Sequence, residues 1–103
     1  MTEARIAALE AMLVENPDDT FALYALAMEL RGTTSERALM CLRRVTALEP
    51  GHHYAYYQLG SLLLELDRTA EAKDCLMAGL DRARADQAQK AASELAALLD
   101  TAG

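Results

Sequence analysis

The sequence predicts an all-α protein in which a pair of helices occurs twice. Its apolar residues are mostly Ala and Leu, which are strong helix formers, while β-branched residues are scarce. The segment around Leu23 is similar to that around Tyr56, 33 residues later, and the segment around Ala38 is similar to that around Ala72, 34 residues later. A chain of 103 residues fits one compact domain. We therefore expect about six antiparallel helices in a single domain.

Apolar residues at helical spacing define the leading helix of each repeat. They are Leu23, Leu26, Ala27 and Leu30 in the first repeat, and Tyr56, Leu59, Gly60 and Leu63 in the second. The helices that follow carry Ala38 and Leu42, then Ala72 and Leu76. The Ala and Gly residues in these sets allow the two helices of each pair to approach closely.

This pattern resembles the tetratricopeptide repeat family, whose unit reads Trp-x-x-Leu-Gly-x-x-Tyr, then Ala-x-x-x-Phe, then Pro, over about 34 residues. The first repeat closes on Pro50, the second has Arg84 in that place, and Pro17 resembles the closing proline of a truncated earlier unit. The resemblance covers residues 17–84 and implies a short right-handed superhelix of helix pairs. It divides the domain into an N-terminal cap helix (1–16), repeat 1 (17–50), repeat 2 (51–84) and a C-terminal cap helix (85–103).

Polar residues at the predicted helix ends indicate how the helices begin. The expected caps are Asp18 or Asp19, a capping box of Thr33 with Glu36, then Asp67 or Thr69, and finally Asp86 with Gln89. The first repeat is one residue shorter than the second between its two helices. Segments 3–15 and 87–99 have one apolar face each, and we expect both to cover the ends of the repeat array.

All five aromatic residues lie on the two leading helices, which line the concave face in the family that the chain resembles. The resemblance therefore implies an apolar, aromatic partner-binding groove, with Arg31 and Gln58 as its polar groups. The predicted groove residues are Phe21, Tyr24, Met28, Arg31, Tyr54, Tyr57, Gln58, Ser61 and Leu64. The alternative for Phe21 and Tyr54 is that they pack under the cap helices. One subclass of the family binds a C-terminal carboxylate through basic groove residues, and this chain lacks that basic set.

Residues for catalysis or metal binding are sparse. His52 and His53 are adjacent, so they do not share a helix face and make a poor metal pair. We expect both to be solvated turn residues. The three serines have no histidine near them in sequence, and the five glycines are scattered singly rather than gathered in a phosphate-binding loop. The sequence thus predicts no enzyme, no cofactor and no metal site.

The charge of the chain limits the classes of partner. A formal charge of −6 disfavours nucleic acid and anionic membrane surfaces. No stretch approaches the roughly 18 apolar residues of a membrane span, and no basic start precedes an apolar run, so the expected compartment is the cytoplasm. The predicted function is a non-catalytic scaffold that binds a protein or peptide partner. The alternative is a structural subunit, such as a homodimer, that uses the same face.

The two cysteines occupy equivalent positions in successive repeats, and we predict that both are free thiols. Equivalent positions are separated by at least one helix-packing distance, roughly 8–10 Å, whereas a disulfide needs Cα atoms within about 7 Å. Titration of the unfolded, unreduced protein should therefore find both Cys41 and Cys75 reactive. Finding no reactive thiol would contradict the prediction.

Overall fold

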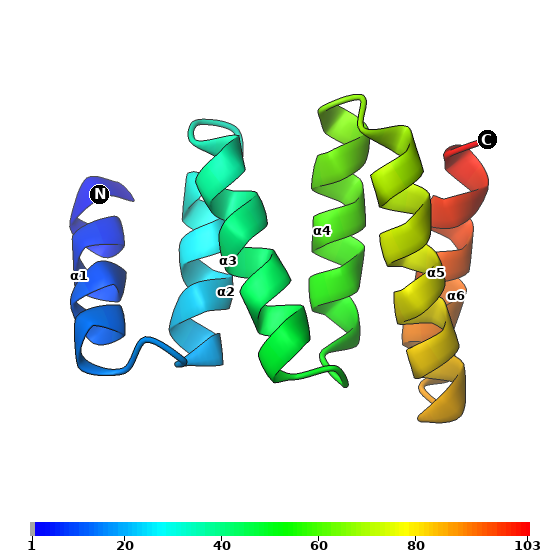
Figure 1. The fold of residues 1–103 in the computed structure, drawn as a ribbon, viewed down its shortest axis with the longest axis horizontal. Coiled ribbons are helices and arrows are strands. Elements are labelled where there is room, and N and C mark those ends of the chain that lie inside the picture. Colours follow the sequence, from blue (N-terminus) through cyan, green and yellow to red (C-terminus); the bar gives the residue numbers. More distant parts are fainter. Residues whose placement is uncertain (1) are drawn as a thin grey trace. The chain divides into compact units, whose positions relative to one another are not determined.

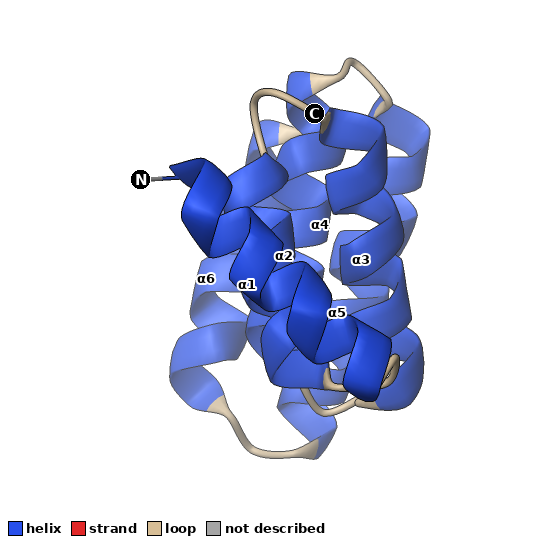
Figure 2. Ribbon diagram, turned by 90° about the vertical axis from the view of Figure 1, so that its left-hand side faces the viewer, coloured by secondary structure: helices blue, strands red, loops and turns tan. Residues whose placement is uncertain are grey.

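The structure, a computed structural model, describes residues 2–103, and this part of the chain forms six α-helices joined by short turns (Figure 1, Figure 2). The helices are α1 (Thr2–Glu15), α2 (Thr20–Leu30), α3 (Ser35–Leu48), α4 (His53–Glu65), α5 (Thr69–Ala85) and α6 (Gln89–Thr101). No strand occurs between residues 2 and 103, so the predicted all-α class and the six helices are confirmed. None of these helices has both the length and the apolar character that crossing a bilayer requires.

The helices form two compact units, and each unit has its own core. The first unit ends at Glu49 and contains α1, α2 and α3, with α2 packed against both of the others. The second unit runs from Pro50 to Gly103, where α5 packs against α4 and α6 and α6 also contacts α4. In both units, the central helix is therefore covered on two sides.

The core of the first unit comes almost entirely from the predicted repeat. Its buried apolar residues on α2 and α3 are Ala22, Leu23, Leu26, Ala27, Leu30, Ala38, Leu39, Leu42 and Val45. The helix α1 contributes only Leu9 to the buried set. Since apolar burial is the main source of stability in a small domain, α1 is the least firmly held helix of this unit.

The core of the second unit depends on two glycines that let helices approach closely. A Cβ at Gly60 would overlap the Leu76 side chain of α5, and a Cβ at Gly79 would lie 2.5 Å from Cβ of Tyr56 on α4. The buried cluster of this unit comes from α5 and α6, and Tyr56, Tyr57 and Leu64 of α4 pack against it; its members are Leu76, Leu80, Ala83, Ala91 and Leu95. The close contact predicted for Gly60 is thus confirmed, and Gly79 adds a second one.

Of the expected helix caps, only one at α2 has formed. Asp19 accepts a hydrogen bond from the N–H of Ala22 at 3.1 Å, whereas Asp18 pairs with Arg44 of α3. The predicted capping box at α3 is wrong, because the N-cap is Thr34 and the Thr33 hydroxyl instead donates to the carbonyl of Leu30.

The caps predicted at α5 and α6 are also wrong, and the physical reason is the same at both helices. Asp67 and Gln87, each two residues after the end of α4 or α5, adopt the left-handed backbone region, with φ of 59° and 58°. The next N–H then closes the preceding helix: that of Arg68 donates to Leu63 O at 2.9 Å, and that of Ala88 donates to Ala83 O at 2.8 Å. The backbone closure places Arg68 and Ala88 at the N-caps, so Thr69, Asp86 and Gln89 do not cap these helices.

We predict that Gly79→Ala lowers the free energy of unfolding. Alanine gains about 0.5–1 kcal/mol over glycine inside a helix, but overpacking against the rigid Cβ of Tyr56 costs about 1–3 kcal/mol. Thermal unfolding followed by circular dichroism would show this, with Ala78→Gly of the same helix as the control for helix propensity. A raised melting temperature for Gly79→Ala would show that the close approach is absent.

Candidate functional site

The predicted binding residues of the first unit lie along one side of α2. Phe21 is 69% exposed in the first turn, and Tyr24 and Met28 are half-buried further along the helix. Arg31 follows the last residue of α2, where its backbone N–H donates to the carbonyl of Ala27 at 2.9 Å. These residues lie between the buried positions of α2, so the side chains that do not enter the core are largely apolar.

The predicted residues of the second unit lie on α4, and they differ in how firmly they are packed. Tyr54 is 39% exposed, while Gln58 and Ser61 are half-buried. Tyr57 and Leu64 pack against the buried cluster that α5 and α6 form in this unit. Tyr57 and Leu64 therefore stabilise the unit as well as lying on the predicted face.

The alternative in which Phe21 and Tyr54 pack under cap helices is wrong, because both side chains are exposed. They occupy equivalent positions, one residue after the start of α2 and of α4. Tyr56 packs against Gly79 of α5, and burial raises the pKa of its hydroxyl above the ordinary value although the nearby Arg82 opposes the shift.

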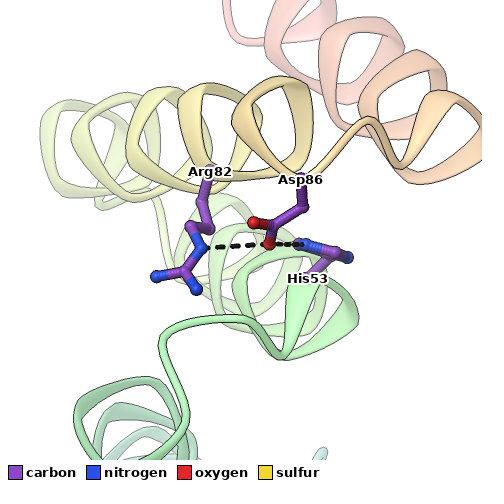
Figure 3. A network of polar contacts seen from close by, with 3 residues as sticks. All are labelled: His53, Arg82 and Asp86. Atoms are coloured by element: carbon purple, nitrogen blue, oxygen red, sulfur yellow. Dashed lines mark hydrogen bonds and ion pairs between the residues drawn. The ribbon is translucent and has the colours of Figure 1, made fainter.

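The two histidines are structural, and the expectation that they are solvated turn residues is wrong. His52 is the N-cap of α4, and its Nδ1 accepts a hydrogen bond from the N–H of Ala55 at 3.2 Å. His53 donates from Nε2 to Oδ2 of Asp86 at 2.8 Å, and Arg82 donates from Nε to the same oxygen at 3.0 Å (Figure 3). The His53 side chain is only 17% exposed.

This contact has a counterpart in the first unit. The Thr20 hydroxyl donates to Oε2 of Glu49 at 2.8 Å. In both units, the first residue of the leading helix thus bonds the residue directly after the trailing helix, Thr20 to Glu49 and His53 to Asp86. We call this contact the end clasp. It ties the two helices of a pair together at one end.

Two titratable groups in the described part of the chain, Asp86 and Cys41, have pKa values shifted by their surroundings. Hydrogen bonds from His53 and Arg82 hold the pKa of Asp86 below its ordinary value, so this carboxylate is an acceptor rather than an acid at neutral pH. Burial raises the pKa of the Cys41 thiol, although Arg37 opposes this, and a raised pKa makes a poor nucleophile. Cys75 donates its thiol to the Tyr56 carbonyl at 3.5 Å. Neither cysteine forms a disulfide, and both are half-buried.

One depression was missed by the sequence analysis. It lies where α5 turns into α6 and has a volume of about 470 Å³. Its lining residues are Ala83, Arg84, Gln87, Ala88, Gln89 and Ala92. Half of these residues are alanines and the other half are polar. A single sequence gives no signal for such a surface, because the alanines there cannot be distinguished from ordinary helix formers.

Comparison with known proteins agrees with this architecture. The tetratricopeptide repeat family matches residues 53–86. A solution structure of a tetratricopeptide repeat domain protein from Salinibacter ruber is 38% identical over 84% of this chain and 89% of that one, with a TM-score of 0.77. A crystal structure from the same organism is 38% identical over 82% and 96%, with a TM-score of 0.73. No curated protein matches the chain.

A third structure shares the fold at low identity. It is the TPR2B domain of yeast Sti1, solved as a complex with pHsp70. Its TM-score is 0.84 at 18% identity, and the match covers 94% of this chain and 78% of that one. The arrangement of helices is therefore shared well beyond recognisable sequence similarity.

The lowered pKa of Asp86 leads to a prediction for Asp86→Asn. A carboxyl with a lower pKa in the folded state stabilises the fold above its unfolded pKa, and the contribution is lost as the pH falls through the folded pKa. The variant should therefore unfold more easily than wild type at neutral pH, and the difference should shrink towards about pH 3. Urea unfolding across this range, with Asp81→Asn on the same helix as control, tests it. A difference that stays constant with pH would contradict the His53 and Arg82 contacts.

Proposed function

Because the chain belongs to the tetratricopeptide repeat family, we propose that it is a non-catalytic interaction module whose leading helices bind a peptide or an amphipathic helix of another protein. The observation that carries the proposal is the exposure of Phe21 and Tyr54 at equivalent positions of α2 and α4. Large aromatic side chains in water are unfavourable, and where they recur at equivalent positions they mark a surface that a partner covers.

The remaining residues of the two helices fit an apolar partner better than a charged one. Around the exposed aromatics lie Tyr24 and Met28 on α2, and Tyr57 and Gln58 on α4. These side chains offer ring faces, a thioether and an amide, which suit aliphatic or aromatic side chains and a few backbone hydrogen bonds. We propose that the partner presents apolar side chains rather than a terminal carboxylate, because neither α2 nor α4 supplies a cluster of lysines.

The fold of the comparison structures supports this class of function. The TPR2B domain of Sti1 was solved with pHsp70, so a set of helices with this arrangement can hold a protein partner. We do not assign the partner of that domain to this chain, because a sequence identity of 18% shows a shared fold alone. What this chain binds follows instead from its own exposed residues.

We predict that Phe21→Ala and Tyr54→Ala weaken partner binding while leaving stability nearly unchanged. The probe is a peptide selected from a displayed random library against the wild-type chain, and its affinity is measured by fluorescence anisotropy. A true hot-spot aromatic contributes about 2 kcal/mol or more, so each variant should bind about 30-fold more weakly. Melting temperatures should hardly move, because neither ring is buried.

The matched controls are Met40→Ala on α3 and Met77→Ala on α5, whose side chains are 70% and 53% exposed on the trailing helices. Both controls should bind the peptide as wild type does. Tyr24→Ala and Tyr57→Ala should weaken binding too, and Tyr57→Ala should also melt earlier because its ring packs on the core of its unit. Normal binding by both Phe21→Ala and Tyr54→Ala would refute the proposed surface.

A further inference from the structure

We propose that α6 of one copy of the chain binds α1 of a second copy, and that the two helices complete a helix pair between molecules. The surface is the depression at the α5–α6 turn together with the face of α6 beside it. The occupant is the N-terminal helix of another copy. This interface is separate from the exposed aromatics of α2 and α4, so it goes beyond the proposed function.

The helix α1 is a trailing helix without a leading partner in the described structure. It aligns with α3 at the same offset of 33 residues, and Ile6, Leu9 and Met12 then correspond to Leu39, Leu42 and Val45. In α3 these residues are 2%, 0% and 0% exposed, whereas in α1 Leu9 is 5% exposed, Ile6 is half-buried and Met12 is 39% exposed. The core positions of a trailing helix are thus present in α1 but only partly covered.

Within the described residues, α6 is a leading helix and no trailing helix follows it. Aligned by its first residue with α4, it places Ala96, Leu98 and Leu99 where α4 has Gly60, Leu62 and Leu63. In α4 all three residues are buried, but in α6 all three are only half-buried. The depression begins at the same end of α6, where Ala88, Gln89 and Ala92 correspond to His52, His53 and Tyr56 of α4.

The side-chain sizes of the two helices are complementary. In the second unit the large Tyr56 packs on Gly79. The equivalent pair in the first unit is Leu23 with Val45, both buried and of intermediate size. Between two copies, the equivalent pair is the small Ala92 with the large Met12. The combined side-chain volume is thus roughly the same in all three pairs, as close packing at a repeated contact requires.

A second position supports the same pairing. The thiol of Cys75 contacts the backbone carbonyl of Tyr56 across the pair. Its equivalents are Cys41 in α3 and Ala8 in α1. Both cysteines are half-buried, but Ala8 is exposed, although it occupies the position at which Cys75 contacts a leading helix. The exposed face of α1 is therefore the face that a leading helix covers.

The end clasp can also form between copies. Its leading-helix residue is Thr20 or His53 within the units and would be Gln89 of α6. Its trailing-helix residue would be Asn16, which directly follows α1. Two amides hydrogen-bond each other well. At this end, Glu15 of one copy would also meet Arg84 and Lys90 of the other, so the charges are complementary.

Such a contact joins two different surfaces, so a bound pair of copies still offers one free α1 and one free α6, and association continues from copy to copy. Light scattering of the 103-residue chain from about 1 µM to about 1 mM should show a mass that rises above 11.2 kDa with concentration. Ala92→Glu and Met12→Glu should each remain at 11.2 kDa over the same range. Ala97→Glu, at an exposed position on another face of α6, should associate like wild type.

Mixing the Ala92→Glu and Met12→Glu variants distinguishes the proposed interface from a symmetric one. An Ala92→Glu copy keeps a working α1 and a Met12→Glu copy keeps a working α6, so the mixture should stop at a 1:1 dimer of twice 11.2 kDa. A symmetric interface would not be restored in this way. Circular dichroism melting confirms that each variant is folded, and Ala8→Glu replaces Met12→Glu if that variant is not.

Three results would overturn the proposal. The wild-type chain could keep a mass of 11.2 kDa at every concentration, or the blocked variants could associate like wild type. Alternatively, replacing both Phe21 and Tyr54 with alanine could abolish association. This result would show that the copies contact each other through these aromatic residues. The last result would leave the binding role of those residues intact, so the two proposals fail separately.

Discussion

The structure depends on how closely the two helices of a pair approach each other. In the second unit this approach is possible only because Gly60 and Gly79 leave room for Leu76 and Tyr56. In the first unit the equivalent positions hold Ala27 and Val45, both fully buried. Tight pairing commits the larger apolar residues to one side of each leading helix. The residues on the remaining side, including Phe21 and Tyr54, are consequently left outside the core.

Equivalent contacts in the two units are kept in geometry but changed in chemistry. The end clasp is a hydroxyl with a carboxylate in one unit and an imidazole with a carboxylate in the other. The N-cap of the leading helix is Asp19 in one and His52 in the other. Both histidines of the chain are thereby accounted for by the repeat itself. Their adjacency reflects two structural positions that happen to be neighbours.

Periodicity in the sequence predicted the helices and most of the core, because buried positions recur wherever the helix pair recurs. Leu26, Leu42, Leu63 and Leu76 were all expected from spacing and are all buried. The helix caps were predicted less well. At Asp67 and Gln87 the backbone closes the preceding helix. A polar residue in a turn is equally compatible with closing one helix and with capping the next, so the sequence alone does not distinguish the two.

The surface was predictable only in part. The aromatic residues stood out because they recur at equivalent positions, but their spacing could not show that Tyr57 packs on the core whereas Tyr54 is exposed. The incomplete burial of α1 and α6 required the structure, since both have core-like sequences. Ile6 and Leu98 look like core residues and are only half-buried.

We propose that a partner binds the leading helices α2 and α4 rather than the trailing helices α3 and α5. Amide chemical-shift mapping of the isotope-labelled chain, on addition of a library-selected peptide, tests this division directly. The largest shifts should fall on α2 and α4, around Phe21 and Tyr54, with little change near Met40 and Met77. Shifts that are largest on α3 and α5 would contradict the account.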